Sequence, residues 1–218
     1  MGRMLSPRAP LFVDLDGVIL DPSRRYFELH REIFEELGGR CPPLAELWRR
    51  KRQGASSSSL CDLDAAGDFD PLAFERSWHE RVEQAAYLDL DTIVPGASER
   101  LSGWRKQRHS LSLVTLRRNR VTLGGQLERL RLLQLFDELL AAGTPACEEP
   151  VAAKVRLIRS SPYFSANAVV IGDTEVDIRA GRQLGLMTIA VAGGLREPQL
   201  LAAENPDCLV ADLTEIGG

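Results

Sequence analysis

The chain has 218 residues, a formal net charge of −4 and 44% hydrophobic residues. A chain of this length buries about 70–75% of the surface that its unfolded form exposes, which is enough for one core and a modest insertion. The acidic balance gives no electrostatic footprint for nucleic acid or an anionic membrane, and no apolar run approaches the about 20 residues of a membrane helix. We therefore expect a globular protein with neither nucleic acid nor a membrane as partner.

The four cysteines are scattered along the chain without C-x-x-C spacing, at Cys41, Cys61, Cys147 and Cys208. This distribution predicts reduced thiols in a cytoplasmic protein, and it favours neither a zinc site nor a disulfide framework. Strand-like sequence begins by Pro10, which leaves little room for a signal peptide. The oligomeric state is left open between a monomer and a homodimer.

The first predicted element is a short buried strand, Leu11-Phe12-Val13, which ends abruptly in acids and a glycine. Apolar spacing and end signals then predict three helices, over residues 24–37, 44–52 and 71–86. Nothing strand-like occurs between Asp21 and Leu90. We therefore predict a helical domain, residues 21–90, inserted into a core domain made of residues 1–20 and 91–218.

Strands and helices alternate over the rest of the chain. The predicted helices cover residues 97–104, 126–133, 151–159 and 176–184, and the predicted strands cover residues 111–114, 138–140, 168–171 and 187–191. This alternation predicts an α/β fold, a doubly wound parallel sheet with an inserted helical domain. In such sheets ligands bind at the carboxyl ends of the strands.

Polar residues occur at these expected strand ends and at nearby helix starts: Asp14, Asp16, Thr115, Lys154, Asp173 and Asp177. Carboxylates 4 Å apart repel by ~4 kcal/mol per pair at an effective dielectric constant near 20, so such a cluster needs a cation. Mg²⁺ is the expected ion, because it prefers a few carboxylate oxygens together with waters and substrate phosphate. Lys154 would neutralise a nucleophile and a phosphate, and the Thr115 hydroxyl would donate to phosphoryl oxygens.

In this order, these residues resemble the motifs of the haloacid dehalogenase-like (HAD) superfamily, within its phosphoglycolate phosphatase and β-phosphoglucomutase-like subgroup. The first motif resembles Asp14-Leu15-Asp16-Gly17-Val18, and the fourth resembles Gly172-Asp173-Thr174-Glu175-Val176-Asp177. Thr115 and Lys154 match the second and third motifs. Thr115 is followed by Leu116-Arg117, where many relatives carry an asparagine.

The resemblance implies that Asp14 is a nucleophile that forms an aspartyl-phosphate. It also implies that the backbone carbonyl of Asp16 joins Asp14 and Asp173 around Mg²⁺, and that the Asp16 side chain is the general acid and base. Asp177 would hold the water shell of the metal or orient Lys154 from behind it. The expected activity is hydrolysis of a small phosphorylated metabolite.

The inserted helical segment resembles the C1 cap of the same superfamily, a lid that closes over substrate. Its basic run Trp48-Arg49-Arg50-Lys51-Arg52 has two interpretations. Arg49, Lys51 and Arg52 would bind a second anionic group of the substrate, or the run is a solvated helix face.

Two other functions remain open from the sequence. A sugar phosphomutase uses the same residues and protects its aspartyl-phosphate from water. A phospho-accepting module without catalysis also uses a doubly wound sheet, although the long insertion and Asp16 argue against it. Asp16 further argues for a leaving group that needs a proton, which disfavours dehalogenase chemistry.

Overall fold

The computed structural model describes residues 5–60, 70–143 and 148–217. Cys61 and Cys147 lie outside the described residues, whereas Cys208 is a free thiol. The chain divides into two compact units, Met1–Asp21 with Ile93–Gly218, and Pro22–Thr92. We call the first the core unit and the second the helical unit.

A six-stranded parallel sheet forms the centre of the core unit, in the order β5-β4-β1-β6-β7-β8. Its strands are β1 (Leu11–Val13), β4 (Leu111–Thr115), β5 (Glu138–Ala141), β6 (Val169–Gly172), β7 (Met187–Val191) and β8 (Cys208–Val210). The chain leaves β1 toward β4 on one side and later returns to β6 on the other. The predicted doubly wound α/β sheet is confirmed, and β1 lies at its topological switch point.

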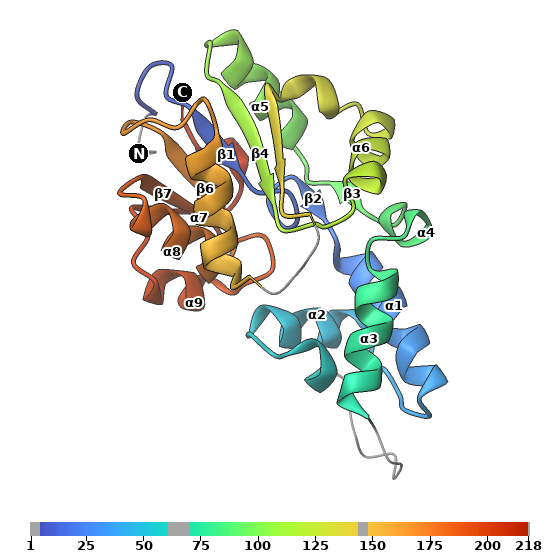
Figure 1. Ribbon diagram of the computed structural model, residues 1–218. Coiled ribbons are helices and arrows are strands. Elements are labelled where there is room, and N and C mark those ends of the chain that lie inside the picture. The colour runs from blue at the N-terminus through green and yellow to red at the C-terminus, as the bar shows by residue number, and fades with distance from the viewer. Residues whose placement is uncertain (1–4, 61–69, 144–147, 218) are drawn as a thin grey trace. The chain divides into compact units, whose positions relative to one another are not determined.

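Helices cover both faces of this sheet (Figure 1). Alternate side chains of β1 enter different cores, because successive residues of a strand point to opposite faces. Leu11 and Val13 pack with Leu101 and Trp104 of α5 (Ala97–Lys106), whereas Phe12 packs with Leu157 of α7 (Pro150–Ser160). The remaining core helices are α6 (Arg120–Arg129), α8 (Glu175–Gln183) and α9 (Pro198–Ala203), with short 3₁₀ turns η2 (Leu133–Leu135) and η3 (Leu213–Glu215).

The helical unit contains α1 (Ser23–Glu36), α2 (Leu44–Arg52), η1 (Ser57–Ser59), α3 (Pro71–Arg81) and α4 (Ala85–Leu88). Two short strands, β2 (Leu20–Asp21) and β3 (Thr92–Ile93), pair where the chain passes between the units. An aromatic cluster that includes Phe34, Phe74 and Trp78 forms the centre of the helical unit. His30 is fully buried among these rings, with its centroid 4.5 Å from that of Trp78.

The structure corrects two predicted helices. The helix predicted over 126–133 begins six residues earlier, at Arg120, because the Asn119 side chain accepts hydrogen bonds from Val121 N and Thr122 N at 3.1 Å each. The helix predicted over 71–86 is two helices, since α3 ends at Arg81 and α4 begins at Ala85. Near this break, the Val82 carbonyl accepts a hydrogen bond from Arg25 at 3.2 Å. Helix α9 and strand β8 were not predicted.

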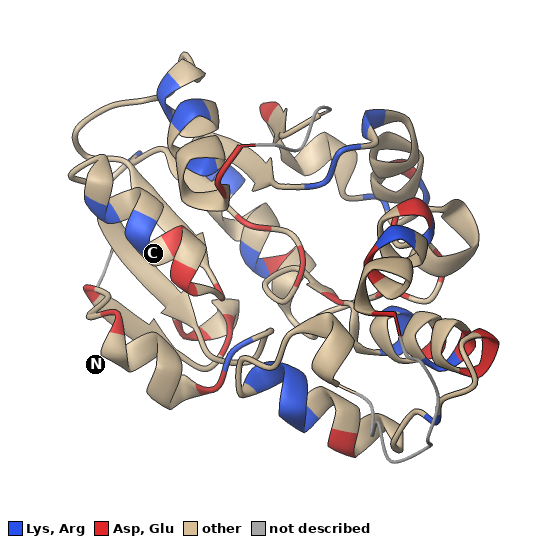
Figure 2. Cartoon of the chain, turned by 60° about the horizontal axis from the view of Figure 1, so that its bottom comes forward, with Lys and Arg blue, Asp and Glu red and all other residues tan. Residues whose placement is uncertain are grey.

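Acidic and basic residues are interspersed over the helices of the core unit and also over those of the helical unit (Figure 2). In α1, Arg31 pairs with Glu28 at 2.8 Å and with Glu35 at 3.3 Å. Residues three or four positions apart lie on the same face of a helix, so these opposite charges largely compensate one another locally. Within the described ranges, no helix has both the length and the apolar character to cross a membrane.

Candidate active site

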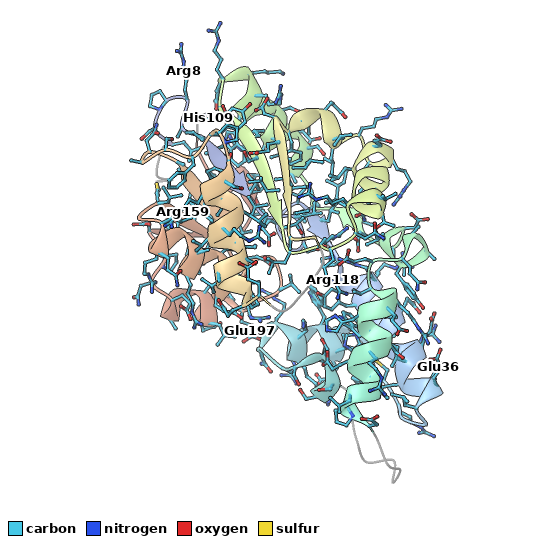
Figure 3. All side chains as sticks on the ribbon, viewed as in Figure 1. Arg8, Glu36, His109, Arg118, Arg159 and Glu197 are labelled. Carbon is cyan, nitrogen blue, oxygen red and sulfur yellow. The ribbon has the colours of Figure 1, made fainter. Side chains whose placement is uncertain are left out.

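The candidate site lies at the carboxyl edge of the sheet in the core unit. Asp14 directly follows β1 and Asp173 directly follows β6, while Thr115 is the last residue of β4. Because β1 pairs with β4 on one side and with β6 on the other, these three residues reach the same edge. Figure 3 shows the two ends of this sheet, with His109 ahead of β4 and Arg118 beyond its far end.

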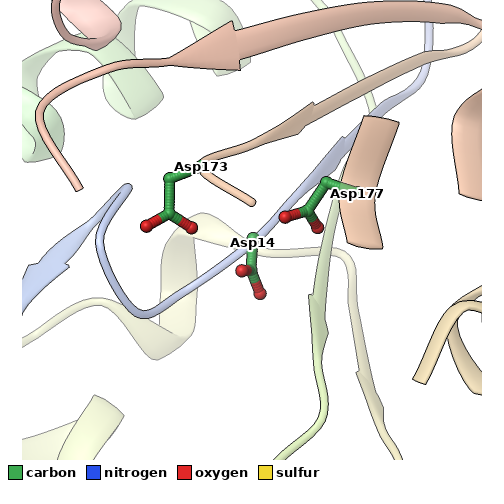
Figure 4. Close-up of side chains that lie close together, drawn as sticks. All are labelled: Asp14, Asp173 and Asp177. Carbon is green, nitrogen blue, oxygen red and sulfur yellow. The ribbon is translucent and has the colours of Figure 1, made fainter. Parts of the chain in front are cut away.

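Three buried carboxylates gather at this edge (Figure 4). Oxygen atoms of Asp14, Asp173 and Asp177 all lie within 4.8 Å of one another. The Nζ of Lys154, in the second turn of α7, is 3.1 Å from Oδ1 of Asp14 and also contacts Oδ1 of Asp177. One buried ammonium group therefore bridges two of the three carboxylates.

Asp177 is held by the first turn of α8. Its Oδ2 accepts hydrogen bonds from the Thr174 backbone N–H at 3.1 Å and from the Thr174 hydroxyl at 2.7 Å, while its Oδ1 faces Lys154. This is a capping box, in which the helix start and the carboxylate fix one another. Of the two roles expected for Asp177, the orientation of Lys154 has direct contacts in its support.

Asp173 is fully buried and has one oxygen without a protein partner. Its Oδ2 accepts a 2.5 Å hydrogen bond from the Leu195 backbone N–H, but its Oδ1 has no hydrogen-bond partner. A Cβ atom added at Gly17 or Gly194 would collide with this carboxylate, so both glycines are needed for the backbone to approach it. A buried carboxylate oxygen without a donor, beside two more carboxylates, fits the oxygen ligands that Mg²⁺ prefers.

The electrostatics agree with a site that needs a cation. Burial raises the pKa of Asp14 to about 7, although the nearby Lys154 ammonium partly offsets the rise. Burial, together with the charges of Asp14 and Asp177, raises the pKa of Asp173 well above its ordinary value. Burial lowers the pKa of Lys154, but Asp14 and Asp177 outweigh it, so the net shift is upward. Lys154 is therefore a permanent cation in this site, whereas Asp14 and Asp173 bind protons readily without a metal.

Asp16 does not join the acidic cluster but pairs with Arg117. Its two oxygens accept from Nε and NH2 of Arg117 at 2.9 and 2.6 Å, a two-pronged pair across 101 residues of sequence. Another guanidinium nitrogen, NH1, donates to the side-chain oxygen of Gln126, and the Arg117 backbone N–H donates to the Thr115 hydroxyl at 3.3 Å. Arg117 thus connects the predicted second motif to the first.

Arg49 and Lys51 of the basic run contact other residues of the helical unit. Arg49 makes two hydrogen bonds to Glu46, at 2.8 and 2.7 Å, and a third to Gln53 at 2.7 Å. Lys51 lies over the Tyr26 ring, 5.2 Å from its centroid. Arg52 is the last residue of α2. Contact of Arg49, Lys51 and Arg52 with a substrate stays a prediction.

Comparison with known proteins agrees with this geometry. Residues 11–191 match the family of haloacid dehalogenase-like hydrolases. The chain belongs to this family. A phosphoglycolate phosphatase from Pseudomonas savastanoi pv. phaseolicola is 24% identical over 221 residues, covering 96% of this chain and 78% of that protein.

Solved structures of HAD-family proteins share the fold. A predicted phosphatase from Clostridium acetobutylicum aligns with a TM-score of 0.78 at 18% identity, covering 96% of each chain. A protein assigned as a β-phosphoglucomutase from Thermotoga maritima aligns with a TM-score of 0.69 at 22% identity, covering 95% of each chain. The predicted HAD-like fold and subgroup are confirmed, as is the prediction of a hydrolase of the phosphatase type.

Sequence reasoning missed two contributions to the site. In the sequence Arg117 stands out only beside a position where many relatives carry an asparagine, and no sequence pattern predicts its pairing with Asp16. The second contribution comes from the loop after β7, in which the Leu195 backbone N–H donates to Asp173 and Gly194 allows the close approach. The signal available was the pair Gly193-Gly194, one residue after the end of β7, a pattern typical of close backbone approach.

Proposed function

We propose that this HAD-family hydrolase is a Mg²⁺-dependent phosphatase that hydrolyses a small phosphorylated metabolite through an aspartyl-phosphate on Asp14. One observation carries the proposal: the buried Lys154 ammonium bridges Asp14 and Asp177 beside Asp173, whose Oδ1 has no protein donor. Asp14, Asp173 and the backbone carbonyl of Asp16 would hold the ion. When bound, Mg²⁺ supplies positive charge to the phosphoryl oxygens.

In the first step, a carboxylate oxygen of Asp14 attacks the phosphorus atom. A new bond forms between that oxygen and phosphorus, and the bond to the leaving oxygen breaks with its electron pair. Asp16 gives its proton to the leaving oxygen, so a neutral alcohol departs. Lys154 and the Thr115 hydroxyl neutralise charge on the transferring phosphoryl group.

In the second step, Asp16 takes a proton from a water molecule as that water attacks the aspartyl-phosphate. The bond between phosphorus and the Asp14 oxygen breaks, inorganic phosphate leaves, and Asp14 recovers its carboxylate while Asp16 is again protonated. A general acid or base of this kind contributes typically ~10²–10⁴-fold in rate.

The test is phosphate release from a panel of phosphorylated metabolites with and without Mg²⁺. Asp14→Asn removes the nucleophile and is expected to abolish Mg²⁺-dependent release. Glu128→Gln is the matched control, because it makes the same carboxylate-to-amide change at an exposed position of α6. Activity of the Asp14→Asn protein at the parent level would refute the proposal.

Phosphoglycolate is the first substrate to try, because relatives that match over nearly the whole of this chain are phosphoglycolate phosphatases. Alanine at Arg49, Lys51 and Arg52 tests whether the basic run recognises a second anionic group. Losses confined to substrates with such a group would support that role, and equal losses for all substrates would contradict it. A sugar phosphomutase remains the alternative, distinguished by transfer of phosphate to a bound sugar without release of free phosphate.

The proposal extends to a cytoplasmic location and a monomer or homodimer without nucleic acid or membrane partners. Support for a reducing compartment comes from the scattered cysteines, which lack C-x-x-C spacing, and from Cys208, which is a free thiol. Alkylation of the native protein, followed by mass spectrometry, tests this by counting reduced cysteines in protein taken directly from cells.

A further inference from the structure

We propose that Arg117 is a positioning residue for Asp16, which it holds in the orientation needed for proton transfer to the leaving group. The inference rests on the proposed function, because it assigns a task to Arg117 only if Asp16 transfers the proton. It goes beyond that function by adding a residue that neither the motifs nor the acidic cluster identifies.

The contact itself is specific. Both Asp16 oxygens are engaged by two different nitrogens of one guanidinium group, at 2.9 and 2.6 Å. A planar fork that matches a carboxylate fixes the direction of the carboxylate plane, whereas a single ammonium group fixes only its distance. The Asp16 side chain keeps partial solvent exposure, at 19%, so it remains accessible from the solvent side.

Arg117 is itself anchored, which a positioning residue requires. Its side chain is only 5% exposed, and its remaining terminal nitrogen donates to the buried side chain of Gln126 in α6. Its backbone N–H donates to the Thr115 hydroxyl at the end of β4. The guanidinium group is therefore anchored to α6, and the Arg117 backbone is anchored to the end of β4.

The buried acidic cluster has partners of its own. Lys154 is occupied with Asp14 and Asp177, and Asp173 receives the Leu195 backbone N–H. Asp16 also follows Leu15 and precedes Gly17, whose φ of +84° belongs to a tight turn that leads the chain away from β1. A carboxylate on such a turn gains its orientation from its partner. This orientation matters for catalysis, because misplacement by about 1 Å can cost ~10²-fold in rate.

The test uses two substrates with different leaving groups. The p-nitrophenolate ion of p-nitrophenyl phosphate departs without a proton, whereas the alkoxide of an alkyl phosphate such as phosphoglycolate needs one. The ratio kcat/KM reports all steps up to release of the leaving group. Arg117→Met is therefore expected to lower kcat/KM for phosphoglycolate by ~10²-fold and to leave that for p-nitrophenyl phosphate within about twofold.

Three further variants separate positioning from other roles. Arg117→Lys keeps the charge but not the fork, so it is expected to show the same selective loss. In an Asp16→Asn background, Arg117→Met is expected to change kcat/KM by no more than about twofold, because the residue it positions is already inactive. Arg105→Met is the matched control: its partner Asp137, 2.8 Å away, precedes β5 and lies at the opposite edge of the sheet.

Mg²⁺ affinity, measured by titration calorimetry on the same variants, gives a readout independent of activity. Arg117→Met is expected to bind Mg²⁺ within about twofold of the parent, as an independent site would. Equal losses for both substrates, a large loss of Mg²⁺ affinity, full rescue by Arg117→Lys, or losses that multiply in the Asp16→Asn background would each overturn the inference. Failure of the proposed function is distinguishable, because it shows as an active Asp14→Asn protein.

Discussion

Replacement of Lys154 by methionine gives the sharpest test of the site's electrostatics. The substitution leaves Asp14 and Asp177 buried without their shared cation. At the observed 3.1 Å, the attraction between Lys154 and Asp14 alone is about 5 kcal/mol at an effective dielectric constant near 20. Part of that attraction offsets the cost of burying the ions, and removal of one partner from a buried pair typically costs about 3–5 kcal/mol.

The loss of stability caused by Lys154→Met depends on pH, and the pKa of Asp14 determines whether that loss grows or shrinks as pH rises. In the metal-free parent that pKa is raised to about 7, from an ordinary 3.8, mainly by burial. A raised carboxyl pKa means that the folded state binds the proton more tightly than the unfolded state. The contribution of this group to the free energy of unfolding is therefore present at low pH and is lost as pH rises through the folded pKa. Without Lys154 the folded pKa rises further, so the penalty is largest at pH 8 and smaller at pH 5.5.

Urea unfolding in the presence of EDTA, followed by circular dichroism, measures this difference. The expected destabilisation of Lys154→Met is about 3–5 kcal/mol at pH 8, with a smaller value at pH 5.5. Lys106→Met is the control, because Lys106 is an exposed lysine at the end of α5. An equal loss at the two pH values, or a loss no larger than that of the control, would refute the electrostatic reasoning.

Three more outcomes follow from the structure. If Mg²⁺ binds at Asp14 as proposed, protons compete with it there, so the rise in melting temperature on adding Mg²⁺ should be larger at pH 8 than at pH 5.5. A rise independent of pH would contradict this. Gly17→Ala places a methyl group against the Asp173 carboxylate at a φ of +84°, so calorimetry should show weaker Mg²⁺ binding. The control is Gly124→Ala, which adds a methyl group in open space within α6 and should stabilise the fold by about 0.5–1 kcal/mol. Burial lowers the pKa of His30 to about 4. The unfolding free energy of the helical unit should therefore fall by up to about 3 kcal/mol as pH drops from 6.5 to 4, which amide exchange of α1 measures. If the fall were no larger than in the His30→Leu protein, His30 would not be its cause.

The sequence predicts the acidic cluster well because its members follow the ends of strands. Asp14 and Asp173 come directly after short, fully buried strands, and parallel pairing of β1 with β6 forces them to one edge. Asp177 follows Asp173 by four residues on the first turn of a helix. These placements depend only on strand periodicity and on the parallel arrangement, both of which local sequence reveals.

Arg117 and the start of α6 could not be predicted in the same way. The pair Arg117–Asp16 joins an irregular loop to a turn across 101 residues, so no local period reports it. The glycines Gly124-Gly125 inside α6 favour a later helix start, because glycine costs about 1 kcal/mol in a helix interior. Asn119 is a strong capping residue and its two hydrogen bonds prevail over that preference.

The charges at the site connect metal binding to the activation of the nucleophile. Under the proposed mechanism Asp14 must be a carboxylate to attack phosphorus, yet burial raises its pKa to about 7 even with Lys154 beside it. Lys154 provides one positive charge against three buried carboxylates, so a proton and a divalent cation are alternative ways to compensate the rest. A proton on Asp14 would remove the proposed nucleophile, whereas a cation shared with Asp173 would keep it ionised. The burial that makes the metal-free site costly is therefore the same property that would make catalysis depend on the metal.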